Sequence, residues 1–395
     1  GNPNLTESRM RVFFIGFGIK AGFVPFHTWL PYAHPAAPSH VSGVMSGIII
    51  KSGIYGILRI ILLTPENHLA IGYIILTVSV ISSVYGVMLA IVQHNLKRLL
   101  AYHSIENIGI IGIGIGIGTI GSGLNNSLMA FAGYAGALLH VLNHSLFKSM
   151  LFYTSGNILH GVRTLMMDKM GGLIHKMPYT AFAFLIAAAA ICGLPPLNGF
   201  ISEFLIYSGL LAAIAQNQTP LTIILAVTGL TLTGGLAILC FTKAFGIIFL
   251  GTRRDHSNHA PEEMERGGLI PLYMIAFLIF CIGLFPGLFI SFLKNPVAEF
   301  IPVPVTTAFN HLPDLMQNIS LAAWSFVFLT ALLFLARRLL QYKSESYGPT
   351  WGCGYTANST KIQYTATSFV RPYVKMLKPV FEVKKTDNTI TSIIP

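Results

Sequence analysis

Three ionisable side chains recur at one-turn spacing within an apolar stretch of this sequence. His140, His144 and Lys148 occupy positions i, i+4 and i+8 in a run from about 126 to 158. On a helix these positions form one stripe, with successive side chains roughly 6 Å apart along the axis. Polar groups that persist inside a membrane-length segment usually line a proton or ion path, so the stripe predicts such a path.

Further ionisable residues lie in similarly apolar surroundings. Each costs about 2.5–3.5 kcal/mol at the centre of a membrane on insertion scales, and a simple anchor needs none of them. Imidazole exchanges protons near neutral pH, and buried Lys and Glu titrate closer to neutrality than exposed ones. A metal site would need carboxylates or cysteines near the histidines, so the set favours a proton relay. Its members are Lys20, Lys51, His103, Glu106, His140, His144, Lys148, Glu203 and Lys243.

Structural explanations compete for some of these residues. Lys51 could extend to the membrane interface, and so could Lys243, which lies near the end of its apolar run. A lone buried histidine often only hydrogen bonds to a helix carbonyl. The glycine repeat at 112–118 lies inside an apolar span with no strand before it. It therefore predicts close helix packing and not a nucleotide-binding loop.

The composition is that of a polytopic α-helical membrane protein. Of the 395 residues, 53% are hydrophobic and 10% are charged, whereas about 25% are charged in a typical soluble domain. Helices satisfy their own backbone hydrogen bonds in lipid, so the recurring apolar runs are expected to be helical. We expect an all-α transmembrane bundle of about nine spans, at 10–29, 41–63, 69–92, 99–120, 126–158, 180–215, 221–250, 269–292 and 319–340.

Two of these spans contain residues that interrupt a helix. The first contains Gly22 and Pro25, and the sixth reads CGLPPLNGF over 192–200. Proline removes a helix hydrogen bond, and broken backbone at membrane depth is tolerated only where protein or water satisfies it. Lys20 lies beside the first break and Glu203 beside the second. A pair of interrupted helices predicts an inverted-repeat, antiporter-like fold.

The basic residues predict the orientation of the chain. They gather in alternate loops at 97–98, 163–176, 253–266 and 337–343. The positive-inside bias places these loops and the polar tail in the cytoplasm and the N-terminus outside. We therefore expect a multi-pass protein of the inner (cytoplasmic) cell membrane, and the net charge of +11 does not indicate nucleic-acid binding.

The cysteines predict no cofactor on this chain. Cys192, Cys240, Cys281 and Cys353 show neither C-x-x-C nor Cys/His ligand spacing. An iron–sulfur cluster or a zinc site on this chain is therefore not expected.

Several of these segments together resemble a known membrane protein family. The segments are KAGFVPFHTWLPYAH at 20–34, IKSGIYGILR at 50–59, NLKRLLAYHSIENIG at 95–109 and GLPPLNGFISEF at 193–204. They are similar to signatures of the antiporter-like membrane subunits of respiratory complex I. Multisubunit sodium/proton antiporters and membrane-bound hydrogenases share that fold. SIENIG, LPPLNGF and the later TWGCGY are most similar to the hydrogenase-4 component B and formate hydrogenlyase group.

The resemblance implies roles for individual residues. The family moves protons through a lysine on the first broken helix, a connecting lysine, a central relay and an acidic residue on the second broken helix. Glu106 lies on a helix whose repeat counterpart carries the family's input glutamate. The lysine on the first broken helix matches Lys20, and the connecting lysine matches Lys51. The acidic residue on the second broken helix matches Glu203, and the central relay matches His140, His144 and Lys148.

The resemblance also implies a division of the chain. Residues 1–250 are expected to form part of a proton-antiporter-like transmembrane domain, 251–340 additional transmembrane helices and 341–395 a cytoplasmic polar tail. Family members carry several helices before the first broken one, including a glutamate that pairs with the lysine at Lys20. We therefore expect that N-terminal portion to be missing here.

Three functions remain open from the sequence. In the first, electron transfer in partner subunits of the hydrogenase-4, formate hydrogenlyase or NADH:quinone oxidoreductase type drives protons or sodium through this subunit. The partners are then other membrane subunits and a peripheral redox arm, which holds any iron–sulfur, nickel–iron or flavin group. In the second, the chain belongs to a multisubunit sodium/proton antiporter without a redox partner. In the third it is a structural anchor, and the intramembrane charges argue against that.

Overall fold

The computed structural model describes residues 3–216, 221–254, 260–301, 306–340 and 363–377. Within these ranges the chain is all-α, apart from an isolated β-bridge between Asn95 and Met166. The α-helices are α1 (Pro3–Ala21), α2 (Leu30–Ala36), α3 (Ser39–Val44), α4 (Lys51–Leu62), α5 (His68–Ile91), α6 (Leu96–Gly123), α7 (Ser127–Val162), α8 (Pro178–Ile191), α9 (Asn198–Ala215), α10 (Leu221–Phe249), α11 (Arg266–Leu284), α12 (Pro286–Ala298), α13 (Thr306–Leu340) and α14 (Ala366–Leu377). A π-helical segment (Met45–Ile49) joins α3 to α4, and 3₁₀ turns lie at Pro65–Asn67, Met167–Lys169 and Leu173–His175.

Seven helical stretches of the described chain are long and apolar enough to cross a membrane. The chain is therefore a polytopic helical membrane protein. Two shorter apolar helices, Val12–Ala21 within α1 and the whole of α8, are the first halves of the interrupted segments. The 36-residue α7 is long enough but not among the seven, because its polar side chains lower its hydropathy. The seven stretches are Ser39–Leu62, Pro65–Ile91, Leu96–Gly123, Asn198–Ala215, Leu221–Phe249, Arg266–Leu284 and Asp314–Leu340.

Both predicted helix interruptions are confirmed. The chain leaves α1 at Ala21 and resumes helical structure at Leu30, and it leaves α8 at Ile191 and resumes at Asn198. Gly22 and Gly193 have φ angles of 89° and 63° at these points. Glycine adopts this left-handed region without the penalty that a Cβ atom causes, so it ends each half-helix.

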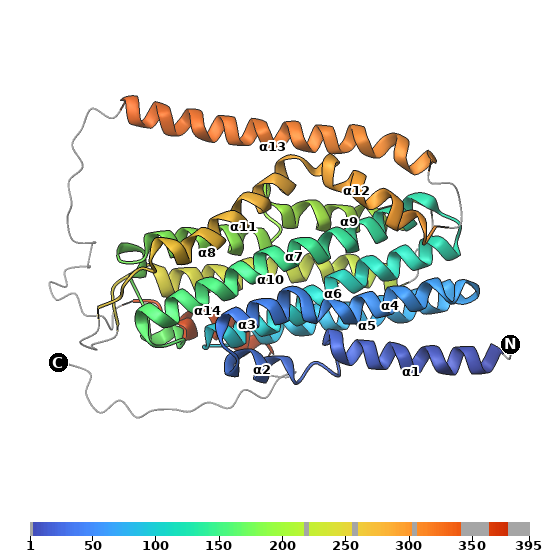
Figure 1. The fold of residues 1–395 in the computed structure, drawn as a ribbon, viewed down its shortest axis with the longest axis horizontal. Helices are drawn as coiled ribbons and strands as arrows, with labels where there is room; N and C mark the ends of the chain where they lie inside the picture. The colour runs from blue at the N-terminus through green and yellow to red at the C-terminus, as the bar shows by residue number, and fades with distance from the viewer. Residues whose placement is uncertain (1–2, 217–220, 255–259, 302–305, 341–362, 378–395) are drawn as a thin grey trace.

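The helices run side by side along the long axis of the molecule, with α6 and α7 at the centre (Figure 1). The hydrophobic window of α6 is entirely buried. A Cβ atom on Gly116 would lie 2.8 Å from the backbone nitrogen of Leu76 in α5, and one on Gly118 would lie 2.8 Å from the ring of Tyr134 in α7. The glycine repeat therefore serves close helix packing, as predicted.

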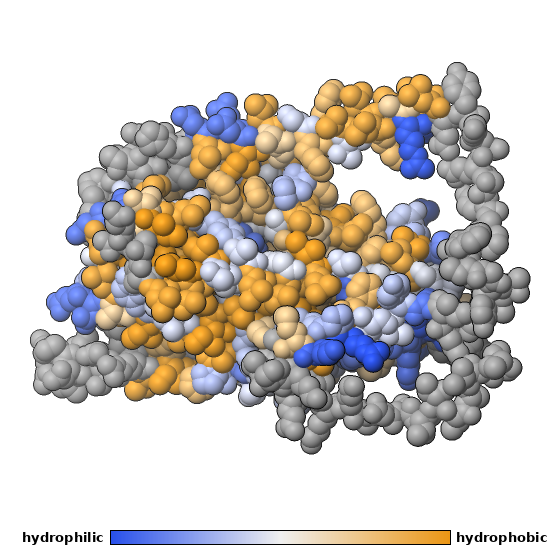
Figure 2. Space-filling model, turned by 180° about the vertical axis from the view of Figure 1, so that it is seen from behind, coloured by the Kyte–Doolittle hydropathy of each residue, from blue (hydrophilic) through white to orange (hydrophobic). Residues whose placement is uncertain are grey.

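The last helices of the chain are arranged differently from the bundle. In Figure 1, α13 lies apart along one side, and its hydrophobic window is only 6% buried. The short α14 packs at one end of the bundle against α10, where Val370 and Tyr373 are buried. Hydrophobic side chains cover the middle of the face seen in Figure 2, and hydrophilic ones lie mostly towards its ends. This distribution is the one that a bilayer requires.

Hydrogen bonds fasten α14 to the loops at that end. Asp168 accepts hydrogen bonds from His94 Nδ1 at 2.5 Å and from the N–H of Ala366, the first residue of α14, at 3.0 Å. Burial raises the pKa of Asp168, but these hydrogen bonds outweigh burial and hold the pKa below its usual range. Arg254 adds bonds to the carbonyls of Met170 and Tyr364, at 2.6 and 2.7 Å.

Candidate functional site

The predicted stripe on α7 lies at the buried centre of the bundle. His140, His144 and Lys148 are all fully buried. The rings of the two histidines are stacked with centroids 6.5 Å apart, as one helical turn requires. Unlike a lone histidine bonded to its own helix, each of the three side chains contacts a residue of another helix.

Lys51 contacts the middle of the stripe from the first residue of α4. Its Nζ atom lies 2.5 Å from His144 Nδ1 and also donates to the carbonyl of Ser46. Ser46 lies in the π-helical segment that joins α3 to α4. Lys51 is only 7% exposed, so it does not extend to an interface as the alternative interpretation required. It is instead a buried partner of His144 on the stripe.

His140 joins two other helices. Its Nε2 lies 3.1 Å from Asn107 Oδ1 in α6, and its Nδ1 lies 2.9 Å from Ser202 Oγ in α9. Asn143, on the same face of α7, donates to Ser202 Oγ at 2.9 Å and to the carbonyl of Asn198 at 2.7 Å. The first turn of the second half-helix is therefore held directly against the stripe.

Lys148 and Glu106 form the other end of the network. The Lys148 ammonium donates to the carbonyl of Leu100 in α6 and lies 5.8 Å from the ring centre of Phe152. Glu106 lies further along α6 than Leu100 and is buried. It interacts electrostatically with Lys148 and is hydrogen bonded to His103. A buried lysine and a buried glutamate therefore lie within reach of each other's charge.

A side branch continues from His103 towards α10. The His103 ring packs on Phe241 with centroids 4.6 Å apart and lies beside the Cys240 thiol. Lys243, one turn further along α10, is 1% exposed and donates to the carbonyls of Ile91 and Gln93. Lys243 is therefore buried at the C-terminal end of α5 and does not extend to solvent.

Glu203 and Lys20 lie at the two breaks but in different surroundings. The partly buried carboxylate of Glu203 lies over Gly193, where an added Cβ atom would be 2.7 Å from Oε2. It also interacts electrostatically with Glu106. Lys20 is in the last turn of α1 and is exposed in the described structure. Of the seven residues to which the resemblance assigns roles, the structure therefore brings five into one buried region, places Glu203 partly buried at the second break and leaves Lys20 exposed.

The hydrogen-bonding residues between the ionisable groups were not identified from the sequence. They are small polar side chains on four helical segments, and each lies within five positions of a predicted residue. That proximity is the only sequence signal that could have indicated them. They are Ser46, Ser104, Asn107, Asn143, Asn198 and Ser202.

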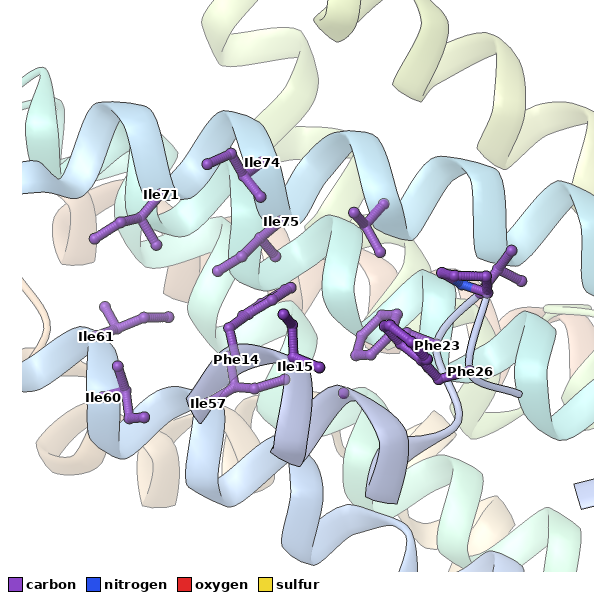
Figure 3. Close-up of a pocket in the computed structure, with 14 residues that line it drawn as sticks. Phe14, Ile15, Phe23, Phe26, Ile57, Ile60, Ile61, Ile71, Ile74 and Ile75 are labelled. Carbon is purple, nitrogen blue, oxygen red and sulfur yellow. The ribbon is translucent and has the colours of Figure 1, made fainter. Parts of the chain in front are cut away.

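An apolar cavity of 540 Å³ lies beside the first interruption (Figure 3). It is lined by α1, the break, α4 and α5, and its walls include Phe14, Phe23, Ile57 and Ile75. None of its lining side chains can ionise, so they offer no group that binds a proton. Within the part of the chain that the structure describes, no three His, Cys, Asp or Glu side chains gather as metal ligands would.

The sequence matches a family described as "NADH:quinone oxidoreductase/Mrp antiporter, TM" over residues 4–234. The chain belongs to this family. Its buried lysine–histidine–glutamate network lies within the matched residues, apart from Lys243 at the end of the side branch.

Named relatives place the chain near hydrogenase subunits. It is 35% identical to hydrogenase-4 component B of Escherichia coli over 371 residues, which cover 90% of this chain and 55% of that protein. It is also 35% identical to formate hydrogenlyase subunit 3 of the same organism, covering 96% of this chain and 62% of that one. The chain thus spans a little over half the length of these relatives.

Solved structures confirm the antiporter-like fold. The membrane-bound sulfane sulfur reductase, an archaeal respiratory membrane complex, contains a chain with a TM-score of 0.74 and 22% identity, covering 93% of this chain and 60% of that chain. Respiratory complex I from Thermus thermophilus contains a chain with a TM-score of 0.62 and 24% identity, and the match covers 74% of this chain and 59% of that chain.

Proposed function

We propose that the protein is a proton-translocating membrane subunit of a redox-driven complex of the hydrogenase-4 or formate hydrogenlyase type. Electron transfer in partner subunits drives ion movement through this chain, and the redox groups reside in those partners. The buried network from Lys51 through His144 to His140, Lys148 and Glu106 is the observation that carries the proposal. A membrane anchor has no use for five buried ionisable groups in one place.

The network divides the work among its residues. A lysine and a glutamate in electrostatic contact each stabilise the other's charged form. When one of them moves away or changes its protonation, the other therefore binds or releases a proton more readily. Histidine can accept a proton at one ring nitrogen and release one from the other, so it can pass protons between neighbouring groups. Lys51 and Lys148 therefore act as charge carriers, His140 and His144 pass protons between them, and Glu203 serves the exit beside the second break.

The proposal includes the topology of the chain. Nine crossings result when the two interrupted segments and α7 are each counted as one. The basic loops then lie on one side, which the positive-inside bias assigns to the cytoplasm together with α14 and the tail. Residues 1–250 form part of the proton-antiporter-like domain, with further helices over 251–340 and a cytoplasmic tail over 341–395.

The test uses the full-length protein in its complex, reconstituted in liposomes. Lys148→Met removes a buried charge, and Lys176→Met removes a charge of the same kind from an exposed loop. We expect the first substitution to reduce ion movement per electron transferred at least about tenfold and the second to leave it unchanged. Undiminished coupled ion movement in Lys148→Met would refute the proposal.

The alternative is a subunit of a multisubunit sodium/proton antiporter without a redox partner. The family includes Mrp antiporters, and a chain of the Mrp complex from Dietzia has the same fold, with a TM-score of 0.64. Co-purification with a nickel–iron or quinone-reducing arm supports the first function. Sodium/proton exchange by a purified complex that contains no redox subunit supports the second.

A further inference from the structure

The hydrogen bonds around His140 fix where its protons lie. Asn107 Nδ2 donates to the carbonyl of His103 at 2.8 Å, and a carbonyl can only accept. Asn107 therefore presents its oxygen to His140 Nε2, which must carry a hydrogen. The basic atom of a neutral His140 is consequently Nδ1, and Nδ1 faces Ser202 on α9.

The same reasoning fixes the partners of Ser202. Asn143 Nδ2 donates to the carbonyl of Asn198, so this atom is the amide nitrogen, and its second hydrogen points at Ser202 Oγ. Ser202 Oγ also lies 3.0 Å from the carbonyl of Gly199. The single hydroxyl hydrogen of Ser202 therefore has two possible acceptors, His140 Nδ1 and the Gly199 carbonyl.

We propose that the Ser202 hydroxyl is a two-position switch that sets the protonation state of His140 and exchanges its proton with the α9 side of the bundle. When His140 is neutral, Ser202 donates to Nδ1. When His140 is protonated, Nδ1–H donates to Ser202 Oγ and the hydroxyl turns to the Gly199 carbonyl. Both ring nitrogens remain hydrogen bonded in each state, so neither state leaves a buried polar group unpaired.

The transfer step moves one proton and needs only a proton donor on the α9 side, a carboxyl group or a water. The donor's O–H bond breaks as a new O–H bond forms on Ser202 Oγ, and the original O–H bond of Ser202 breaks as its proton passes to Nδ1. The imidazole gains one proton and the donor is left deprotonated. The reverse sequence returns it to α9.

Two features connect this switch to the second helix interruption. Gly199 and Ser202 both lie in the first turns of α9, immediately after the break, and the Gly199 carbonyl is in the turn that positions Glu203. The buried or partly buried ionisable groups of the network on the elements around His140 are His144 and Lys148 on α7, Lys51 on α4, His103 and Glu106 on α6 and Glu203 on α9. Among these elements, α9 is the one that the basic Nδ1 atom faces.

The proposal rests on the ion-translocating function, so its test has two independent readouts. The first is ion movement by the reconstituted complex. The second is the ¹⁵N signal of His140 Nδ1 in the labelled full-length protein in lipid, assigned by its loss in His140→Gln. The variants are Ser202→Ala, which removes the hydroxyl, Ser202→Thr, which keeps it, and Ser208→Ala, a control two turns further along α9 whose hydroxyl bonds only locally to the Phe204 carbonyl.

We expect Ser202→Ala to reduce ion movement at least about tenfold and to shift the Nδ1 signal to that of an unbonded nitrogen. Ser208→Ala should stay close to wild type in both readouts, and Ser202→Thr, which keeps the hydroxyl, should keep the signal of a hydrogen-bonded Nδ1. If Ser202→Ala does not assemble, Ser202→Cys replaces it, because a thiol is a weaker donor and acceptor of similar size.

The outcomes separate the two claims. Wild-type ion movement in Ser202→Ala, or an unchanged Nδ1 signal, overturns the switch. A wild-type complex that moves no ions overturns the proposed function, and the Nδ1 signal alone then decides whether Ser202 sets the protonation of His140.

Discussion

Substitution of Gly193 by alanine changes the second helix break in two ways that can be separated. The backbone there has a φ angle of 63°, which costs about 1–2 kcal/mol for a residue with a Cβ atom. The new Cβ atom would also lie 2.7 Å from Glu203 Oε2, closer than ordinary contact distance. The carboxylate is the end of a flexible side chain, so it can move away by several tenths of an ångström at small energetic cost.

We therefore expect a moderate loss of stability and a larger loss of function. The free energy of unfolding of Gly193→Ala should fall by about 1–2 kcal/mol, measured by steric trapping in bicelles. Ion movement by the reconstituted complex should fall at least about tenfold, because a displacement below 1 Å can cost up to about 100-fold in a positioned site.

Two further variants assign the effects to their causes. Gly193→Asn accepts the left-handed backbone more readily than alanine but keeps the Cβ atom. It should therefore recover stability without recovering ion movement. The double variant Gly193→Ala with Glu203→Ala removes the contact and should show the backbone cost alone. Wild-type ion movement in both Gly193→Ala and Gly193→Asn would refute the placement of a functional Glu203 carboxylate over the break.

Three other substitutions test separate parts of the structure. Lys51→Met removes the partner of His144 Nδ1, and ion movement should fall at least about tenfold; wild-type rates would contradict its role in the relay. Asp168→Asn weakens the attachment of α14, seen as faster hydrogen exchange in that helix. Because the folded pKa of Asp168 is lowered, the stability that it contributes is present above about pH 3.9 and is lost as the pH falls through the folded pKa. Hydrogen exchange in α14 that changes neither with the substitution nor with pH would contradict this role. Gly116→Ala pushes a Cβ atom against the α5 backbone and should lower the free energy of unfolding by about 1–3 kcal/mol. Gly246→Ala, where a Cβ atom meets nothing within 4 Å, should raise it by about 0.5–1 kcal/mol. Equal free energies of unfolding for the two variants would contradict the close packing of Gly116.

The breaks and the glycine packing could be predicted because their causes are local in the sequence. Glycine and proline impose their backbone preferences wherever they occur, so Gly22 and Gly193 indicated the interruptions directly. The attachment of α14 could not be predicted in this way. It depends on Asp168 meeting Ala366 across nearly 200 positions of the chain, and no local preference encodes that contact.

The acidic loop at 262–265 shows the same limit. Glu263 in this loop accepts hydrogen bonds from the N–H groups of Tyr179 and Thr180 at the start of α8. A carboxylate satisfies the unpaired N–H groups of a helix N-terminus. Here it is supplied from a distant segment, so the capping pattern is absent from the sequence around α8.

The ionisable stripe was predictable because its spacing on one helix is sufficient to align it. The residues that connect it to other helices were not, because a serine or an asparagine in an apolar helix bonds more often to its own backbone than to a relay. Ser202 does both, with bonds to Gly199 and to His140. Its role follows only from the packing of α9 on α7, together with the orientation of two asparagine amides.

Under the proposed function, the hydrogen bonds of the described residues also indicate which proton transfer needs a movement of a side chain or of water. Lys51 is bonded to His144, and His140 is bonded to Asn107 and Ser202. The two histidine rings are stacked 6.5 Å apart, and each presents its bonded nitrogens to a different helix. Proton transfer between the two rings therefore needs a bridging water or a rotation of one ring. Transfer between Lys51 and His144, or between His140 and Ser202, needs neither, because these pairs are already hydrogen bonded. Under the proposed function, the transfer between His144 and His140 is therefore the one expected to limit ion movement, and a substitution that holds either ring in place should slow it without altering the hydrogen bonds on its own side.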